Sequence, residues 1–413
     1  MKQALKLDLA MEDLPVFFTF FLWSFGSGGQ QLARPLFAAS FGVPVLLISL
    51  IATSNSSSRL LTAPITGFLT DRWGRKPLLL AGVLFRGITT ALEFFADGYL
   101  QFLILEFIGG IGVSTWTTGS SILMADLTTV ENRGRVLAAR SLSSRIGGIA
   151  GPFVAAAIGV AFGLRAIFLF NTVTKLIMLV ILLRLIRETR PESARVMNRE
   201  GTGVSWRTRM AMFLTRPFML LMLVTLTQSM MSQGIFMAIF PVYLQDNLGF
   251  NTQAIGNLLT LAGAATLIVT FPNGILVDIY GRKRTLVPGL LFYALSAVLL
   301  TLVGDFSMAV AMVLVFGLAD GVAMGSSQAY VIDMAPEGQR GAFIGSWSFF
   351  SGMGGVIAPL LVGLVAGGAG YGWAFLMVAA SLVVSGIVMG LYGPDFGGRA
   401  RRAGPAAELA SFS

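Results

Sequence analysis

The sequence contains no cysteine and no histidine, and only 12% of its 413 residues are charged. The lack of cysteine excludes disulfide bonds and thiolate chemistry, and the lack of both residue types excludes the usual ligands of soft metals. A proton that the protein handles must therefore bind to carboxylates. A Gly-x4-Gly-Lys-Ser/Thr nucleotide-binding motif is also missing, and the polar segments are too short for a catalytic domain. We expect neither ATP-driven transport nor an enzyme.

Apolar residues, in contrast, make up 55% of the chain, and the mean hydropathy is +0.78. A soluble protein of this length needs more charge to cover its surface. Apolar runs of about 20 residues, long enough to cross a bilayer, recur along the whole sequence. We predict an all-α integral membrane protein with twelve transmembrane helices, near residues 15–39, 44–70, 77–96, 99–125, 135–162, 165–187, 216–244, 252–278, 285–304, 307–333, 341–366 and 371–393.

Basic residues predict the orientation of these helices. Outside the predicted helices, the lysines and arginines lie on the side that holds both termini, with the single exception of Arg165. This side is cytoplasmic by the positive-inside rule, so we expect a multi-pass protein of a bacterial-type plasma membrane (inner membrane). The net charge of +9 is then mainly a topology signal, and we expect the lipid bilayer, and no nucleic acid, as a partner. Because the N-terminus carries acidic residues and no small-residue cleavage site, we expect no removable signal peptide.

The sequence repeats itself at an offset of 207 residues. The segment GFLTDRWGRK at 67–76 returns as GILVDIYGRK at 274–283, and Pro152 returns as Pro359. Six predicted helices separate the copies, so both halves cross the membrane in the same sense. Proteins with such parallel repeats bind substrate near the bilayer midplane between the halves. We therefore predict two parallel six-helix bundles at 1–188 and 216–395, a cytoplasmic connector at 189–215 and a cytoplasmic tail at 396–413.

The repeated segment resembles the signature loop between helices 2 and 3 of the major facilitator superfamily, whose second copy lies between helices 8 and 9. Asp126 with Arg133, and Asp333 with Arg340, resemble the acidic-x6-Arg pairs that follow helices 4 and 10 in that family. The resemblance covers essentially the whole chain, and within the superfamily the sequence resembles the 12-helix drug:proton antiporters. It implies a secondary transporter that moves a small molecule by alternating access.

Charged residues of these motifs suggest a cytoplasmic latch. The aspartates lie at C-terminal helix ends and two of the arginines near helix starts, where helix dipoles disfavour each charge. If an acid and a base meet across helix ends, their attraction offsets the unfavourable position of each. Such pairs would hold the cytoplasmic face closed. The alternative is that the basic residues only anchor the topology. The candidate latch residues are Asp71, Arg75, Asp126, Arg133, Asp278, Arg282, Asp333 and Arg340.

Three further segments resemble drug-exporting members of the family. Gly147, Gly151 and Pro152 match a Gly-x3-Gly-Pro antiporter element, although the two glycines that follow in the family are Ala155 and Ala156 here. A small-residue packing face with a proline kink explains this segment equally well. Segments 26–35 and 233–243 resemble the Gly- and Pro-interrupted helices 1 and 7. Interrupted helices in matching positions point to the binding site, which makes Gln30, Gln233 and Phe240 cavity candidates.

Ionisable residues inside predicted helices are costly and indicate function by default. Glu106 opens a segment that resembles the Arg-x-x-x-Gly-x-Gly motif of helix 4, but with Glu in place of Arg. It can carry a proton, pair with Arg34 or Arg145, or form a structural ion pair. Asp320 can titrate or bind a polar neighbour such as Gln228. The resemblance implies that helices 1, 4, 7 and 10 line the cavity and that helices 3 and 6 are peripheral. We interpret Arg86, Glu93 and Lys175, on helices 3 and 6, as mostly structural or snorkelling.

These residues leave two transport hypotheses open. The first is a proton-coupled exporter of amphipathic or drug-like compounds, with Glu106 and Asp320 as proton-coupling candidates and an apolar wall in the second half. The alternative is a proton-coupled symporter of an organic anion or other small metabolite, suggested by Arg34, Arg59 and Arg145 facing one cavity. These three arginines and Gln228 are further cavity candidates. We expect a small-molecule substrate, a monomer, and no cofactor apart from a proton or another coupling ion.

Overall fold

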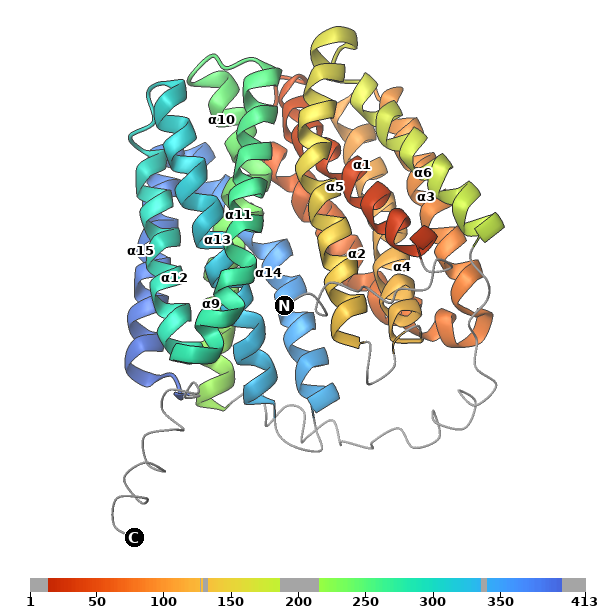
Figure 1. The fold of residues 1–413 in the computed structure, drawn as a ribbon. Coiled ribbons are helices and arrows are strands. Elements are labelled where there is room, and N and C mark those ends of the chain that lie inside the picture. Colours follow the sequence, from red (N-terminus) through yellow and green to blue (C-terminus); the bar gives the residue numbers. More distant parts are fainter. Residues whose placement is uncertain (1–13, 127, 129–132, 186–214, 336–339, 396–413) are drawn as a thin grey trace, which may run out of the picture. The chain divides into compact units, whose positions relative to one another are not determined.

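The computed structural model describes residues 14–126, 128, 133–185, 215–335 and 340–395, and every regular element in these ranges is a helix (Figure 1). The predicted tail and nearly all of the predicted connector lie outside the described residues, as do the side chains of four latch candidates: Asp71, Asp126, Arg133 and Arg340.

The first half contains six helices: α1 (Leu14–Ala39), α2 (Val45–Trp73), α3 (Arg75–Phe94), α4 (Tyr99–Asp126), α5 (Arg133–Phe162) and α6 (Ala166–Leu185). The second half begins with one continuous span that comprises α9 (Arg216–Ser229), the π-helical segment η3 (Met230–Ile239) and α10 (Phe240–Asp246). It continues with α11 (Thr252–Tyr280), α12 (Arg282–Leu300), α13 (Phe306–Met334), α14 (Arg340–Ala369) and α15 (Tyr371–Tyr392).

These elements confirm the predicted twelve-helix plan. Among the described residues, ten spans are long and apolar enough to cross a membrane by length and composition. The helices outside this set are α1 and α2, which carry the polar runs GSGGQQ and TSNSSSR. The repeat is visible in the helix bounds, because α2 and α11, and likewise α5 and α14, begin and end at residues related by the offset of 207.

The two signature loops use their glycines in the same way. Gly74 separates α2 from α3 with a φ of 98°, and Gly281 separates α11 from α12 with a φ of 95°. Each amide donates to the carbonyl four residues earlier, at 3.1 Å. Residues with a Cβ rarely adopt this backbone conformation, so glycine ends both helices with a sharp turn.

The prediction of interrupted helices holds for the seventh span only. Segment η3 widens the helix over ten residues immediately before Phe240 and Pro241, and Pro241 has no N–H to donate to the preceding turn. By contrast, α1 is continuous, with Pro35 inside it, so the predicted interruption of the first helix is wrong. Its glycines provide close contacts with neighbouring helices.

Helices α1 and α5 meet backbone to backbone. A Cβ at Gly147 would lie 2.3 Å from the Phe21 carbonyl oxygen, and one at Gly151 would lie 2.3 Å from the Phe25 carbonyl oxygen. From the other side, a Cβ at Gly28 would lie 2.9 Å from Pro152 Cδ. The small residues of the antiporter-like element therefore let α1 and α5 pack closely, and both interpretations of the element are compatible with this contact.

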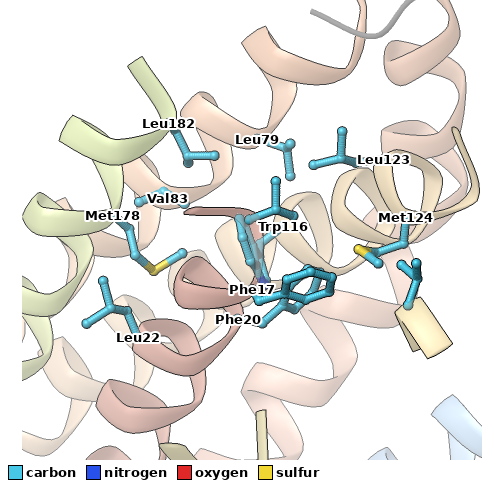
Figure 2. Close-up of a cluster of buried hydrophobic side chains, with 12 residues drawn as sticks. Phe17, Phe20, Leu22, Leu79, Val83, Trp116, Leu123, Met124, Met178 and Leu182 are labelled. Atoms are coloured by element: carbon cyan, nitrogen blue, oxygen red, sulfur yellow. The ribbon is translucent and has the colours of Figure 1, made fainter. Parts of the chain in front are cut away.

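The chain divides into two compact units. The first comprises residues 1–43, 54–201 and 249–260, and the second comprises residues 44–53, 202–248 and 261–413. An apolar core of the first unit draws residues from α1, α3, α4, α5 and α6, and Figure 2 shows their side chains. At its centre Trp116 packs against Phe20 and Trp23, with ring centroids 5.6 and 5.0 Å apart.

Candidate functional site

A cluster of buried polar side chains lies inside the first unit, and we name it the polar cluster. Five helices contribute to it, and six of its seven members are at most 5% exposed. The exception is Arg34, whose side chain is 24% exposed. The members are Gln30 and Arg34 of α1, Asn55 of α2, Arg86 and Glu93 of α3, Glu106 of α4 and Asn171 of α6.

Glu106 is the most highly coordinated member. Its Oε1 atom accepts from Arg34 Nε at 2.7 Å, from Arg86 Nη2 at 3.4 Å and from Gln30 Nε2 at 3.4 Å. Its Oε2 atom accepts from Asn55 Nδ2 at 2.9 Å. The predicted pairing of Glu106 with Arg34 is present. The other predicted partner, Arg145, is not among the contacts of Glu106 in the part of the chain that the structure describes.

Glu93 shares two of these donors. Its Oε1 atom accepts from Arg86 Nη1 at 3.1 Å, and its Oε2 atom accepts from Gln30 Nε2 at 2.8 Å. The Gln30 side chain is oriented by Asn171, whose Nδ2 donates to Gln30 Oε1 at 2.7 Å. That contact directs the Gln30 amino group toward the carboxylates, so one amide and one guanidinium connect Glu93 to Glu106.

Arg86 and Glu93 thus belong to the site, although the sequence analysis placed them at the periphery. Their side chains do not snorkel, because Arg86 is 1% exposed and Glu93 is fully buried. Asn55 and Asn171 were not predicted at all. One signal was available, since Arg86 and Glu93 are seven residues apart and therefore lie on one helical face.

Glycines that follow Glu106 bring its helix close to two neighbours. A Cβ at Gly110 would lie 2.6 Å from the Asn55 carbonyl oxygen on α2, and one at Gly112 would lie 2.8 Å from the Arg86 amide nitrogen on α3. Gly109 leaves room for the guanidinium itself, because a Cβ there would lie 1.8 Å from Arg86 Nη1. The Gly-rich segment therefore positions Glu106 against Asn55 and Arg86.

The second unit builds the same helical plan without these groups. At the offset of 207, the counterparts of Arg34, Glu93 and Glu106 are Pro241, Leu300 and Val313. Those of Gln30, Asn55, Arg86 and Asn171 are Met237, Ala262, Tyr293 and Val378. Burying an ion costs several kcal/mol, and apolar replacements of buried ion pairs are often neutral or stabilising. Because the fold forms without the polar cluster, folding alone does not account for it.

Additional positive charge surrounds the polar cluster. Arg59 on α2 is exposed and lies close enough to Arg34 for their charges to repel, so these two cavity candidates form a partly open basic pair. Lys175 on α6 is 1% exposed, and its Nζ lies 4.2 Å from the Trp23 ring centroid and donates to the Trp23 carbonyl oxygen at 3.3 Å. It does not snorkel, which leaves the structural alternative of our interpretation. Arg145 is half-buried on α5.

In the second unit, Asp320 accepts a short hydrogen bond from the Tyr293 hydroxyl group. Tyr293 occupies the position that corresponds to Arg86, so both units place a donor on this helix against a carboxylate. The expected partner Gln228 instead accepts from Ser327 Oγ at 3.0 Å. The buried Nε2 atom of Gln228 has no hydrogen-bond partner among the described residues.

The cavity candidates and apolar side chains of the seventh span are mostly buried inside the second unit. Phe236 stacks on Phe316 with ring centroids 3.9 Å apart and on Phe240 with centroids 5.2 Å apart. Phe240 is fully buried, so it supports this aromatic stack and faces no open space. Met237 is 39% exposed and Gln233 is half-buried, so both can face a ligand.

The latch candidates of the second unit come together. Arg282 Nε lies 2.5 Å from Asp333 Oδ2, and Arg282 Nη1 lies 3.4 Å from Asp278 Oδ1. Acid and base thus meet across the ends of α11, α12 and α13. In the first unit Arg75 is buried, whereas the side chains of its predicted partners lie outside the described residues.

Comparisons with known proteins place the chain among membrane transporters. A family model described as Major Facilitator Superfamily matches residues 16–236 and 222–411. Tetracycline resistance protein, class H, from Pasteurella multocida is 25% identical over 79% of this chain and 80% of its own length. The sialic acid transporter NanX from Escherichia coli K12 is 25% identical over 87% of this chain and 88% of its own length. The crystal structure of the nucleoside transporter NupG superposes with a TM-score of 0.77 at 15% identity, covering 92% of this chain and 98% of its own, which shows the shared fold.

Proposed function

Because the chain belongs to the Major Facilitator Superfamily and is therefore a membrane transporter and not an enzyme, we propose that it exports amphipathic or drug-like small molecules in exchange for protons. The polar cluster carries this proposal. It holds two fully buried carboxylates in a chain without histidine, and carboxylates are then the side chains able to bind a proton near neutral pH.

Exchange requires that binding of the proton and binding of the substrate change one another's affinity. Arg34 can link them, since its guanidinium binds Glu106 at 2.7 Å and is also 24% exposed. A charged substrate near Arg34 changes the electrostatic field at the carboxylates, and a proton on a carboxylate changes the field at the substrate. Alternating access then carries the substrate in one direction and the proton in the other.

Three observations support export of apolar compounds. The second unit has Pro, Tyr, Leu and Val in place of the four charged residues of the polar cluster, and Met in place of Gln30, and these side chains suit apolar ligands. The segment with Gly147, Gly151 and Pro152 resembles the antiporter element. A tetracycline resistance protein is among the relatives.

Symport of an organic anion is the second candidate function. It is favoured by the partly open basic pair of Arg34 and Arg59, which suits a carboxylate or phosphate. For either function we propose a bacterial inner membrane with both termini in the cytoplasm, on the distribution of basic residues and the bacterial source of the relatives.

A liposome experiment separates the two functions. The purified full-length protein is reconstituted, a pH gradient is imposed, and internal pH is recorded while lipophilic cations and neutral drugs, or organic anions, are added. We expect proton movement with the first panel, abolished in Glu106→Gln. Movement with the anions alone, lost in Arg34→Ala, would establish the symporter.

The matched control is Asp97→Asn. Asp97 forms an exposed ion pair with Arg165 at 2.9 Å, outside the polar cluster. This variant also removes one carboxylate and should transport like the wild type. If proton movement were absent with both panels, the fold assignment would stand, and sodium coupling or a substrate outside both panels would be tested next.

A further inference from the structure

The two carboxylates of the polar cluster are unequally supplied with donors. Glu106 accepts from two guanidinium groups and two amides, and the nearest of these atoms is Arg34 Nε at 2.7 Å. Glu93 accepts from one guanidinium and one amide, and it shares both with Glu106. Both carboxylates are fully buried, so exposure to solvent does not compensate for the difference.

This inequality decides which carboxylate takes a proton first. A proton on Glu106 would weaken contacts with two cations, whereas a proton on Glu93 weakens contact with one. Charge-assisted hydrogen bonds are roughly twice as strong as neutral ones, and the difference is larger away from water. The carboxylate with one shared cation therefore gives up less when it becomes neutral.

Helix α5, which packs against α1, carries the half-buried Arg145, which is not among the ion-pair contacts of either carboxylate in the described residues. The charged groups around the site come from five other helices. They are Arg34 of α1, Arg59 of α2, Arg86 of α3, Glu106 of α4 and Lys175 of α6. Within the polar cluster, two carboxylates match two guanidinium groups when both are ionised. A proton on Glu93 leaves one excess positive charge and lets Arg86 turn fully toward Glu106. Arg34, the partly exposed member, is then less strongly held and more available to a ligand.

We propose that Glu93 is the proton-binding residue of this transporter and that Glu106 is its permanent counter-ion. This inference rests on the proposed function and deepens it. It also relates the two candidate functions. A cationic substrate competes with the excess charge and exchanges with the proton, whereas an anionic substrate binds together with the proton. The charge of the substrate therefore decides between antiport and symport.

Infrared spectroscopy tests the assignment without a substrate. The full-length protein is reconstituted in lipid and titrated from alkaline to acidic pH while the carbonyl band of a buried, protonated carboxyl group is followed. We expect the wild type and the Asp97→Asn control to develop this band. We expect Glu93→Gln to lack it, and Glu93→Asp to develop it at a shifted frequency. The Asp variant keeps the charge and covers the case in which Gln impairs folding.

Each outcome is decisive. An unchanged band in both Glu93 variants would overturn the assignment and place the proton on Glu106 or Asp320. A wild type without any band would also overturn it. Failure of the proposed function is distinguishable, because a band that depends on Glu93, with no proton movement in the liposomes, would refute proton-coupled transport and leave the assignment standing.

Discussion

A single methyl group on α4 tests whether the Arg86 guanidinium holds the polar cluster together. In Gly109→Ala the new Cβ would lie 1.8 Å from Arg86 Nη1 and 3.0 Å from its Cζ. Non-bonded heavy atoms keep roughly 3.5 Å apart, so the guanidinium must retreat by about 1.5 Å. Its bonds to Glu93 at 3.1 Å and Glu106 at 3.4 Å cannot both survive this movement.

The expected loss follows from these contacts. A hydrogen bond to a charged group contributes about 1.5–3 kcal/mol, and one of the two is given up. The change from glycine to alanine within a helix stabilises the folded protein by up to about 1 kcal/mol. Gly119→Ala is the matched control, because it has the same helix preference and its Cβ would meet flexible leucine side chains, Leu79 at 3.2 Å and Leu78 at 3.9 Å. Gly109→Ala should therefore be about 1.5–3 kcal/mol less stable than Gly119→Ala.

Unfolding of the purified protein in detergent by SDS titration measures this difference. The infrared titration on the same samples should also show an altered carboxyl band in Gly109→Ala alone. The reasoning would be refuted if Gly109→Ala matched Gly119→Ala in both stability and band. Arg86 would then have an alternative position that leaves both carboxylates undisturbed.

Three further changes test other contacts. Asp333→Asn removes the closer carboxylate of Arg282, and should speed labelling of a single cysteine introduced at the cytoplasmic face by about fivefold, the equivalent of roughly 1 kcal/mol. Tyr293→Phe removes a hydroxyl donor from Asp320 and should cost about 1–3 kcal/mol in SDS unfolding. Lys175→Met replaces a buried amine that donates to a carbonyl group by an apolar chain of similar length, and should leave stability unchanged or higher.

Each of these has a result that counts against it. Equal labelling rates in Asp333→Asn and wild type would leave the arginine as a topology anchor only. No loss in Tyr293→Phe would mean that another donor satisfies Asp320. A marked loss of stability in Lys175→Met would show that the amine is required where it lies.

The helical spans were predictable because crossing a bilayer requires long apolar runs. The repeat was predictable because both signature loops make the same turn and therefore need the same residue types. Gly74 and Gly281 illustrate the second case, since both have a positive φ at equivalent helix ends. The kind of helix interruption before Pro241 was harder to predict from the sequence. A proline predicts a disturbed helix, but whether the disturbance becomes a kink or a π-helical segment depends on neighbouring helices.

The candidate site was predicted only in part. Glu106 and Arg34 were recognised because they lie on helices that line the cavity in the family, while Arg86 and Glu93 were discounted on a helix considered peripheral. Burial of these side chains depends on close approach of α3 and α4 at Gly109 and Gly112, which no single-helix pattern reveals. A position-by-position comparison of the halves carries the missing signal, because Glu93 corresponds to Leu300.

The central claim is that the polar cluster couples transport to protons. Its most direct test compares two activities of Glu93→Gln in the same liposomes: net transport driven by a pH gradient, and exchange of labelled for unlabelled substrate without a gradient. A variant that cannot complete proton release should lose net transport and retain exchange. Loss of both activities in a folded variant, or retention of both, would contradict the account.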